Sequence, residues 1–416
     1  MITSRQTSRI SNEKLVELFS LGDLYLSDFI DDYSASVERV PLVMALDKKS
    51  GLLQLKHTAP LDKMYQNYWY RSGINKTMTE ELKGIAQKAI SLIKCEKDDI
   101  ALDIGCNDGT LLRFYGNSLY KVGFDPAKNL EKYSTKYADL VVTDYFTAQG
   151  YFNKLSKKAK IITAIAMFYD LEDPREFVND IDAVLDTEGL WIVQMSYMPL
   201  MLKQHAFDNI CHEHLEYYSL SSFEYLIKQH DLKTVDVELN DINGGSFRIY
   251  VRKKDSNDEL FATAPYRDVG AFRIESLLEY EKKLNLNAPE TYTSWFEKIQ
   301  ELKRQTVDFI KSEKAEGKTI WGYGASTKGN TLLQWYGLDN TLIDAIAERN
   351  LTKCGKRTVG TNIAIKSEAE MRQANPDYLL ILPWHFIAEF RNREKEYLNS
   401  GGKFIVPLPQ FEVISK

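Results

Sequence analysis

The stretch ALDIGCNDGTLL, residues 101–112, carries the strongest fold signal in the chain. An apolar run typical of a buried strand ends near Asp103, a loop with two glycines follows, and an apolar segment that we expect to be helical begins at once. Glycine lets a backbone turn tightly and approach a ligand, and the first turn of a helix offers free N–H groups. The loop departs from the GxGxxG pattern because Asn107 and Asp108 interrupt it. A strand-end acid before such a loop suits a ligand that carries an ammonium group and a nucleoside.

Further acids follow the next two expected strands. Asp125 in KVGFDP ends the second strand, where a carboxylate can accept hydrogen bonds from both ribose hydroxyls. Asp144 ends the third strand and precedes Tyr145 and Phe146, which suit the edge and the face of an adenine. A generic turn without a ligand is the alternative, and acids spaced at successive strand ends argue against it. The expected cofactor-binding residues are Asp103, Gly105, Asn107, Asp108, Gly109, Asp125, Pro126, Asp144, Tyr145 and Met167.

The pattern around this loop predicts a parallel sheet. The segments DIALDIG, YKVGFD, DLVVTD, IITAIAM and LWIVQMS alternate with helix-like segments, as in sheets covered on both faces. KTVDVEL and SFRIYVRK then form a hairpin through the turn NDINGG. Seven strands ending in a hairpin resemble the class I S-adenosylmethionine-dependent methyltransferases. The resemblance implies S-adenosylmethionine as the cofactor, lying across the carboxyl ends of the first two strands.

A second strand–helix alternation begins at KTIWGYG, after a charged helical stretch that covers residues 256–317. A chain of 416 residues is also too long for one ordinary hydrophobic core. We therefore predict an α/β protein with three parts: a small N-terminal domain at residues 1–80, a class I methyltransferase Rossmann-like core at residues 81–255, and a second Rossmann-like domain at residues 256–416.

The composition excludes several classes of protein. A formal net charge of −6 gives no reason to expect nucleic acid or a membrane surface as partner. The chain has no apolar run of the roughly 18 residues that a transmembrane helix needs. Its N-terminus lacks the apolar segment of a signal peptide. The four cysteines are scattered, which suits reduced thiols, so we expect a cytoplasmic protein.

The segment ICHEHLEYYS, residues 210–219, places two of the six histidines around a glutamate. A metal site is one interpretation, but zinc needs three or four ligands, and neither HExxH nor CxxC is present. A structural pair of hydrogen-bonded histidines is another. The third is proton transfer, because histidine titrates near neutral pH and a neighbouring glutamate can orient its ring. Methylation of carbon needs such a base to remove a proton next to a carbonyl.

Five segments together resemble the sugar C-methyltransferases that methylate C3 of nucleotide-linked 4-keto-deoxysugars. In chain order they are DIGCNDGTLL, CHEHLEYYSL, NDINGGSFRIYV, GYGASTKGNTLL and DYLLILPWHF. The resemblance implies a nucleotide-sugar substrate in a cleft between the domains, and a monomer or homodimer. It also implies that His214 is the general base and Glu213 its partner. His212 is a further candidate, because it shares a side with His214 if the segment is extended and points away if the segment turns.

The chain departs from this family at several positions. The N-terminal zinc cysteines of the family would fall near Ser4, Thr7, Asp47 and Ser50, so we predict that no metal is bound. Cys211 stands where related enzymes often have tyrosine, and Tyr169 and Asp170 stand after the fourth strand, where those enzymes often have a histidine. Two alternatives therefore stay open: O- or N-methylation of a related small metabolite, and a non-catalytic binding module.

Other substrate candidates lie outside the core motifs. The loop of IWGYGASTKGNTLL can hold a pyrophosphate with Lys328 as a point charge, and a relic nucleotide fold used as a lid is the alternative. Tyr68 and Tyr70 are either core aromatics or hydroxyl contacts to a sugar. Asn243 lies in the hairpin turn near the expected cleft. The expected substrate-binding residues are Tyr68, Tyr70, Asp170, Cys211, Asn243, Lys328 and Asn330.

Overall fold

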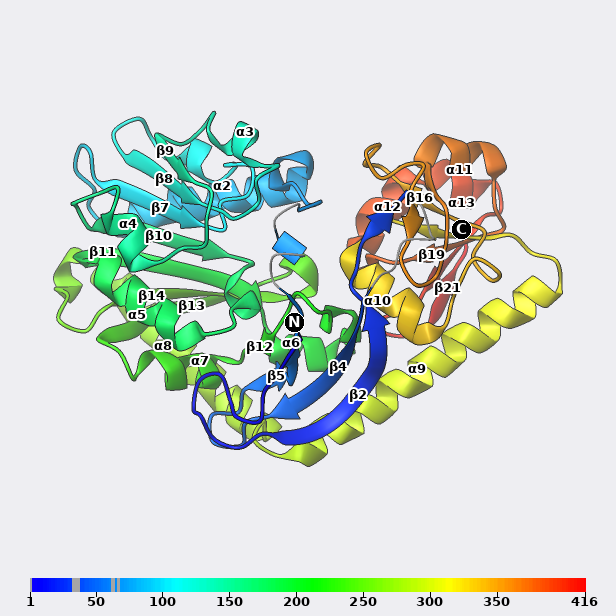
Figure 1. The fold of residues 1–416 in the computed structure, drawn as a ribbon, viewed down its shortest axis with the longest axis horizontal. Coiled ribbons are helices and arrows are strands. Elements are labelled where there is room, and N and C mark those ends of the chain that lie inside the picture. Colours follow the sequence, from blue (N-terminus) through cyan, green and yellow to red (C-terminus); the bar gives the residue numbers. More distant parts are fainter. Residues whose placement is uncertain (1, 32–37, 61–63, 66–67) are drawn as a thin grey trace.

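A computed structural model describes residues 2–31, 38–60, 64–65 and 68–416. Two α/β units lie at opposite ends of a curved molecule (Figure 1). The N-terminal strands β2 (Val16–Tyr25) and β4 (Arg39–Leu46) run between them. The prediction of an α/β protein with two parallel sheets and a small N-terminal part is confirmed.

The first sheet has seven strands in the order β13-β14-β11-β10-β7-β8-β9. The strands are β7 (Ile100–Ile104), β8 (Tyr120–Phe124), β9 (Leu140–Val142), β10 (Ala159–Ile165), β11 (Leu185–Ser196), β13 (Leu232–Asn240) and β14 (Ser246–Lys253). They are parallel except at β14, which runs antiparallel to β11 and β13 and forms the predicted hairpin. Since β7 pairs with β8 on one side and β10 on the other, the winding direction reverses at β7. Open α/β sheets bind ligands at the carboxyl ends of strands at such a reversal.

Helices pack against this sheet through apolar stripes. In α2 (Lys76–Leu92), the buried residues from Met78 to Leu92 recur at three- and four-residue spacing, and Asn75 caps the N-terminus by accepting a hydrogen bond from the Met78 N–H. The other helices are α3 (Glu131–Ser134), α4 (Ala148–Phe152), α5 (Pro174–Val184), α6 (Met198–Lys203) and α7 (Leu220–Ile227).

The prediction of an α-helix directly after the glycine loop was wrong. The loop leads into a single 3₁₀ turn, η2 (Leu112–Phe114), instead of an α-helix. Gly116 and Asn117 follow within a few residues and favour a turn, so the apolar segment is too short for a stable α-helix.

The C-terminal sheet has six strands in the order β18-β16-β15-β19-β20-β21, parallel except for the last pair. They are β15 (Ile320–Tyr323), β16 (Ala345–Glu348), β18 (Ile365–Ser367), β19 (Tyr378–Ile381), β20 (Lys403–Val406) and β21 (Glu412–Ile414). Helices α10 (Thr327–Tyr336), α11 (Glu368–Ala374), α12 (Ile387–Arg393) and α13 (Lys395–Asn399) connect them. The winding reverses at β15, so the loop after β15 occupies the same kind of position as the loop after β7.

The N-terminal strands join the two units. Their sheet has the order β12-β5-β4-β2, in which β5 (Leu53–Leu55) pairs with β12 (Glu216–Tyr217). β12 follows residues 212–214, which we call the HEH segment. Gly51, at φ +74°, lies in the turn between β4 and β5. Two small pairings complete the arrangement: β1 (Thr3–Ser4) with β6 (His57–Thr58), and β3 (Phe29–Ile30) with β17 (Arg357–Thr358) of the C-terminal part.

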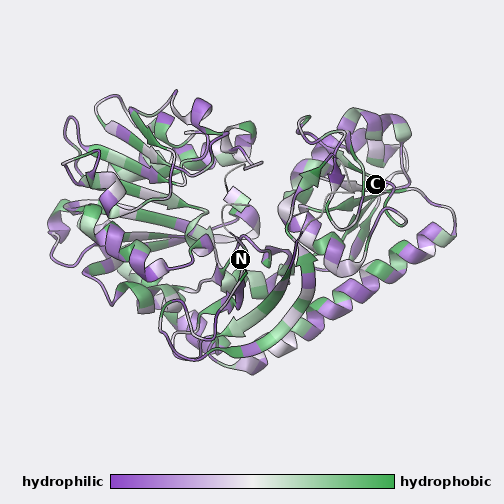
Figure 2. Cartoon of the chain, viewed as in Figure 1, coloured by the Kyte–Doolittle hydropathy of each residue, from purple (hydrophilic) through white to green (hydrophobic). Residues whose placement is uncertain are grey.

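The charged stretch between the two units forms two long helices, α8 (Ala264–Leu284) and α9 (Pro289–Ala315). α8 packs on β13 of the first sheet, whereas α9 contacts β2. Figure 2 shows hydrophobic residues concentrated on the strands, while α9 mixes hydrophilic and hydrophobic residues along its length. Within the described ranges no helix is both long and apolar enough to cross a membrane. As folding units, residues 1–80, 81–255 and 256–416 stay a prediction.

Asp47 and Ser50, near which the zinc cysteines of the resembled family would fall, are hydrogen-bonded to each other. Ser50 Oγ donates to Asp47 Oδ2 at 2.5 Å, and the Lys49 N–H donates to Asp47 Oδ1 at 2.9 Å. Burial alone would raise the pKa of Asp47, but hydrogen bonds from serine side chains and the Lys49 N–H hold the pKa below its ordinary value. The part of the chain that the structure describes contains no group of three or more His, Cys, Asp or Glu residues able to hold a metal.

We therefore expect the purified protein to carry no stoichiometric zinc. The reason is that serine and threonine hydroxyls do not replace the cysteine thiolates that structural zinc sites require. Elemental analysis by mass spectrometry after dialysis checks this. One zinc per chain would contradict the prediction and would place the ligands among residues that we have not paired.

Candidate active site

A cavity of about 1830 Å³ lies between the carboxyl ends of the two parallel sheets. Its described lining comes from the N-terminal segment, the loop after β7, the HEH segment and the loop after β15. Small-molecule pockets usually measure roughly 300–1,000 Å³. The cavity therefore has room for a cofactor and an acceptor side by side.

Glycine is required at two positions of the loop after β7. Gly105 has φ +72°, and a Cβ there would lie 3.0 Å from Met167 Cγ. Gly109 has φ +77°, and a Cβ there would lie 2.9 Å from Ser134 Cα. Any other residue would strain the backbone and collide with its neighbours, so the loop can hold this close approach only with glycine.

Two acids shape the cofactor end of the cavity. Asp103 Oδ1 accepts a hydrogen bond from Thr163 Oγ1 at 2.6 Å, and burial raises the pKa of Asp103 to about 7. A bound ammonium group would counteract this rise by favouring the carboxylate. Asp125 braces the loop, since its Oδ2 accepts from the Asn107 N–H at 2.7 Å and its Oδ1 from the Ala127 N–H at 2.8 Å. Each oxygen keeps a further lone pair for a ribose hydroxyl.

The structure brings eight of the ten expected cofactor residues to the cavity. These are Asp103, Gly105, Asn107, Asp125, Pro126, Asp144, Tyr145 and Met167. The described lining does not include Asp108 and Gly109, which corrects their expected place at the ligand. Asp108 accepts from the Gly73 N–H at 3.0 Å and from Thr110 Oγ1 at 2.6 Å, so it ties the loop to the segment before α2.

The HEH segment forms a turn, and its two histidines have different surroundings. His214 lines the cavity, and its Nδ1 lies 2.9 Å from the Asn209 carbonyl oxygen. Because a carbonyl only accepts, Nδ1 carries the proton and Nε2 keeps a free lone pair. The Tyr169 ring packs edge-on against the imidazole at 4.4 Å between ring centroids. Burial, and then the charge of Lys328, lower the pKa of His214 to about 3, so the ring is a neutral base at physiological pH.

His212 does not line the cavity with His214. Its Nε2 lies 2.9 Å from the Val40 carbonyl oxygen on β4, and burial lowers its pKa to about 4. Because the segment forms a turn, the side chain of His212 points away from that of His214. His212 connects the HEH segment to the N-terminal sheet, which corrects its place among the catalytic candidates.

Two carboxyl groups lie beside His214 in the lining. Burial, and then the charges of Glu213 and Glu216, raise the pKa of Asp170 well above its ordinary value. Burial also raises the pKa of Glu213. Among the described residues, Asp170 Oδ1 and Glu213 Oε2 are buried without a hydrogen-bond partner.

Tyr65 is a lining residue that the sequence analysis missed. Its hydroxyl donates to the Glu213 carbonyl oxygen at 2.9 Å, and its ring lies 6.2 Å from that of Tyr68. Tyr68 and Tyr70 also line the cavity. The dense aromatic run MYQNYWY was the available signal, but it does not distinguish the tyrosines from one another.

The remaining substrate candidates divide into two groups. Lys328, Asn243 and Asp170 line the cavity, and Lys328 Nζ donates to Asn209 Oδ1 at 2.5 Å. Cys211 and Asn330 are 1% exposed and are not part of the described lining, so their expected contact with substrate is corrected.

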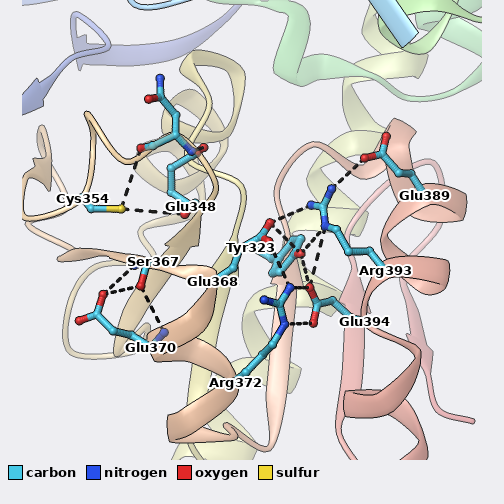
Figure 3. Close-up of polar contacts among 11 residues, drawn as sticks. Tyr323, Glu348, Cys354, Ser367, Glu368, Glu370, Arg372, Glu389, Arg393 and Glu394 are labelled. Atoms are coloured by element: carbon cyan, nitrogen blue, oxygen red, sulfur yellow. Dashed lines mark hydrogen bonds and ion pairs between the residues drawn. The ribbon is translucent and has the colours of Figure 1, made fainter. Parts of the chain in front are cut away.

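The glycine loop after β15 is held by its own neighbours. The Ala325 N–H donates to Glu348 Oε2 at 2.8 Å, and Lys353 Nζ donates to the Ala325 carbonyl oxygen at 2.8 Å. At the end of β15, the Tyr323 hydroxyl joins a network of glutamates and arginines from α11 to α13 (Figure 3). In dinucleotide-binding folds an acid at this position binds the ribose. In this chain Glu348 instead accepts a hydrogen bond from the loop after β15.

Two sequence-family models match the chain. A methyltransferase domain matches residues 74–237, and a C-methyltransferase C-terminal domain matches residues 241–409. The C-methyltransferase NovU of Streptomyces niveus is 28% identical over 378 residues, which make up 90% of this chain and 88% of NovU.

Two methyltransferases of known structure each match less than half of this chain. The plantazolicin methyltransferase BamL, solved with a triazolic desmethylPZN analog and SAH, gives a TM-score of 0.34 at 15% identity over 43% of this chain and 87% of its own. The magnesium protoporphyrin IX methyltransferase of Synechocystis PCC 6803, solved with SAM, gives 0.31 at 9% identity over 42% of this chain and 79% of its own. The fold assignment rests on the order of the strands in the sheet and not on these scores.

Proposed function

The chain belongs to the S-adenosylmethionine-dependent C-methyltransferases, and on this premise we propose that it methylates an enolisable carbon of a nucleotide-linked keto-deoxysugar. The acceptor would be C3 of a 4-keto sugar, with His214 as general base. The observation that carries this proposal is the free Nε2 of a neutral His214 in the same cavity as the loop after β7. A carbon acid next to a carbonyl needs a base of this kind before it can attack a methyl group.

In the proposed reaction, S-adenosylmethionine supplies an electrophilic methyl group, and the residues of the chain prepare the acceptor. The Asn209 carbonyl fixes the proton on His214 Nδ1, so that Nε2 faces the carbon to be deprotonated. Tyr169 restricts rotation of the ring. Glu213, in its ionised form, stabilises the imidazolium that results.

The positive charges on the C-terminal side of the cavity support a nucleotide-linked acceptor. Lys328, Arg349 and Lys353 line that side, and their positive charges suit a diphosphate. Arg349 is exposed, and within the described ranges its guanidinium has no hydrogen-bond or ion-pair partner. The deoxysugar itself is inferred from the five-motif resemblance, since NovU is named only as a C-methyltransferase.

We also propose that the enzyme works in the cytoplasm as a monomer or homodimer. All four cysteines are free, which supports a reducing compartment.

Methyl transfer from S-adenosylmethionine labelled with ¹³C in the methyl group tests the acceptor class. We expect a panel of thymidine-, uridine- and guanosine-diphosphate 4-keto-6-deoxyhexoses to include a substrate whose new methyl carbon is bonded to carbon, as shown by NMR. A methyl group found on oxygen or nitrogen would replace the proposal with its alternative. Label transfer to none of the panel would contradict the substrate class.

A further inference from the structure

The two carboxyl groups of the candidate active site come from different elements that are joined by a backbone hydrogen bond. Asp170 ends the 3₁₀ turn η3 (Phe168–Asp170), which follows β10, and Glu213 lies in the HEH turn. The Leu215 N–H donates to the Tyr169 carbonyl oxygen at 2.8 Å. This bond holds the residue after Tyr169 alongside the residues before Leu215, and Asp170, Glu213 and His214 all line the cavity.

Neither carboxyl has a cationic partner among the residues that the structure describes. Asp170 and Glu213 form no ion pair with a described lysine or arginine, and one oxygen of each is buried and unbonded. Lys328 adds its charge to burial in lowering the pKa of His214, and its Nζ donates to Asn209. An ionised carboxylate in such a place is costly unless it is compensated, so one of the pair takes up a proton.

The surrounding groups decide which carboxyl is neutral. Facing the pair are Glu216 from β12, the neutral ring of His214, the thiol of Cys211 and the phenols of Tyr65, Tyr68, Tyr169 and Tyr217. Burial, and then the charges of Glu213 and Glu216, raise the pKa of Asp170 well above its ordinary value. Burial also raises the pKa of Glu216 well above its own ordinary value, and the pKa of Glu213 is raised by burial and to a smaller extent by the charge of Asp28. A buried acid with carboxyl neighbours and no cationic partner favours its protonated form, and of the two carboxyls Asp170 fits this description better.

We propose that Asp170 is the general acid of the reaction, a proton donor to the carbonyl oxygen of the acceptor, paired with His214 as base. The inference rests on the proposed function. His214 Nε2 takes the proton from the carbon next to the carbonyl as Asp170 gives its own to the oxygen, and the C–H electron pair forms the C=C bond of the enol. The enol carbon then attacks the methyl group, the sulfonium leaves as a thioether, and the O–H proton returns to Asp170. The imidazolium loses its proton to water.

This arrangement assigns different roles to the two carboxyls. A neutral carboxylic acid can donate to an oxyanion as it forms, whereas a carboxylate would repel it. Glu213 precedes His214 in the chain, and its carboxylate form offsets the positive charge that develops on the ring.

Solvent deuterium exchange at the acceptor carbon and single-turnover methylation, measured against pH, test the proposal. We expect Asp170→Asn to lower kcat by about 10²–10⁴-fold with little change in KM, because the carboxamide fills the same space but gives up no proton.

Wild-type activity should fall as pH rises through the pKa of Asp170, since the protonated form is the active one. Glu213→Gln should move that fall to lower pH, because it removes a negative neighbour. Asp180→Asn on α5 is the matched control, a carboxyl with a raised pKa outside the described lining.

An infrared measurement separates failure of this inference from failure of the proposed substrate. At pH 7 the wild-type protein should show a protonated carboxyl C=O band that Asp170→Asn lacks, whatever the acceptor is. If wild type carries no such band, or if Asp170→Asn keeps wild-type kcat and the same high-pH fall, Asp170 is not the acid. If the band is present and no keto sugar of the panel is exchanged or methylated, the substrate proposal fails while the protonated pair stands.

Discussion

We expect His214→Asn to lower turnover by about 10²–10⁴-fold while leaving the affinity for S-adenosylhomocysteine nearly unchanged. Asparagine can still donate to the Asn209 carbonyl, but it has no basic nitrogen in place of Nε2. The cofactor residues in the lining lie at the carboxyl ends of β7, β8, β9 and β10, outside the HEH segment, so the substitution removes the base and leaves them in place. The initial rate of S-adenosylhomocysteine formation measures the loss, and calorimetry measures the affinity.

His205→Asn is the matched control for this substitution. His205 lies at the end of α6, its Nδ1 lies 3.0 Å from the Pro409 carbonyl oxygen, and it is not part of the described lining. We expect it to retain turnover. Full activity of His214→Asn, or activity abolished by a chelator and restored by zinc, would remove His214 as the base and return the metal interpretation of the HEH segment.

The second large effect is expected at Asp125. Asp125→Ala should weaken the binding of S-adenosylhomocysteine by about 1–3 kcal/mol, which is about 5- to 150-fold in Kd. The substitution removes the acceptor for ribose hydroxyls and leaves the Asn107 and Ala127 N–H groups without their partner. Calorimetric titration with S-adenosylhomocysteine measures the change.

Asp139→Ala serves as the control for Asp125→Ala. Its Oδ2 accepts from the Lys121 N–H at 2.8 Å at the start of β8, away from the carboxyl ends of the strands. It should leave cofactor affinity unchanged. Equal affinity of wild type and Asp125→Ala would show that the carboxylate after β8 does not contact the ribose.

The cofactor end of the cavity could be predicted from the sequence because its signals are local. An apolar strand, a glycine that must adopt positive φ and an acid at the strand end all lie within a few residues of each other around Gly105. The acids after β8 and β9 follow the same rule, since parallel strands bring their carboxyl ends to one edge. Asp108 was misplaced because neighbours in a loop alternate between facing the ligand and supporting the turn.

The acceptor end could not be predicted in the same way because contacts distant in sequence build it. The side chain of His212 turns away through its hydrogen bond to Val40, about which the HEH segment itself carries no information. Tyr65 reaches Glu213 across 148 positions of the chain. The pairing of β12 with β5 brings these segments together, and such long-range pairing leaves no pattern in either stretch alone.

Solvent deuterium exchange in the presence of S-adenosylhomocysteine tests the central claim most directly, because it isolates enolisation from methyl transfer. With a nucleoside-diphosphate 4-keto-6-deoxyhexose that is methylated in the complete reaction, the wild-type enzyme should incorporate deuterium at the carbon that accepts the methyl group. His214→Asn should incorporate none above the uncatalysed rate. Methylation of that carbon by His214→Asn at the wild-type rate, with deuterium incorporation equal to that of wild type, would contradict the assignment of His214 as the base that forms the enol.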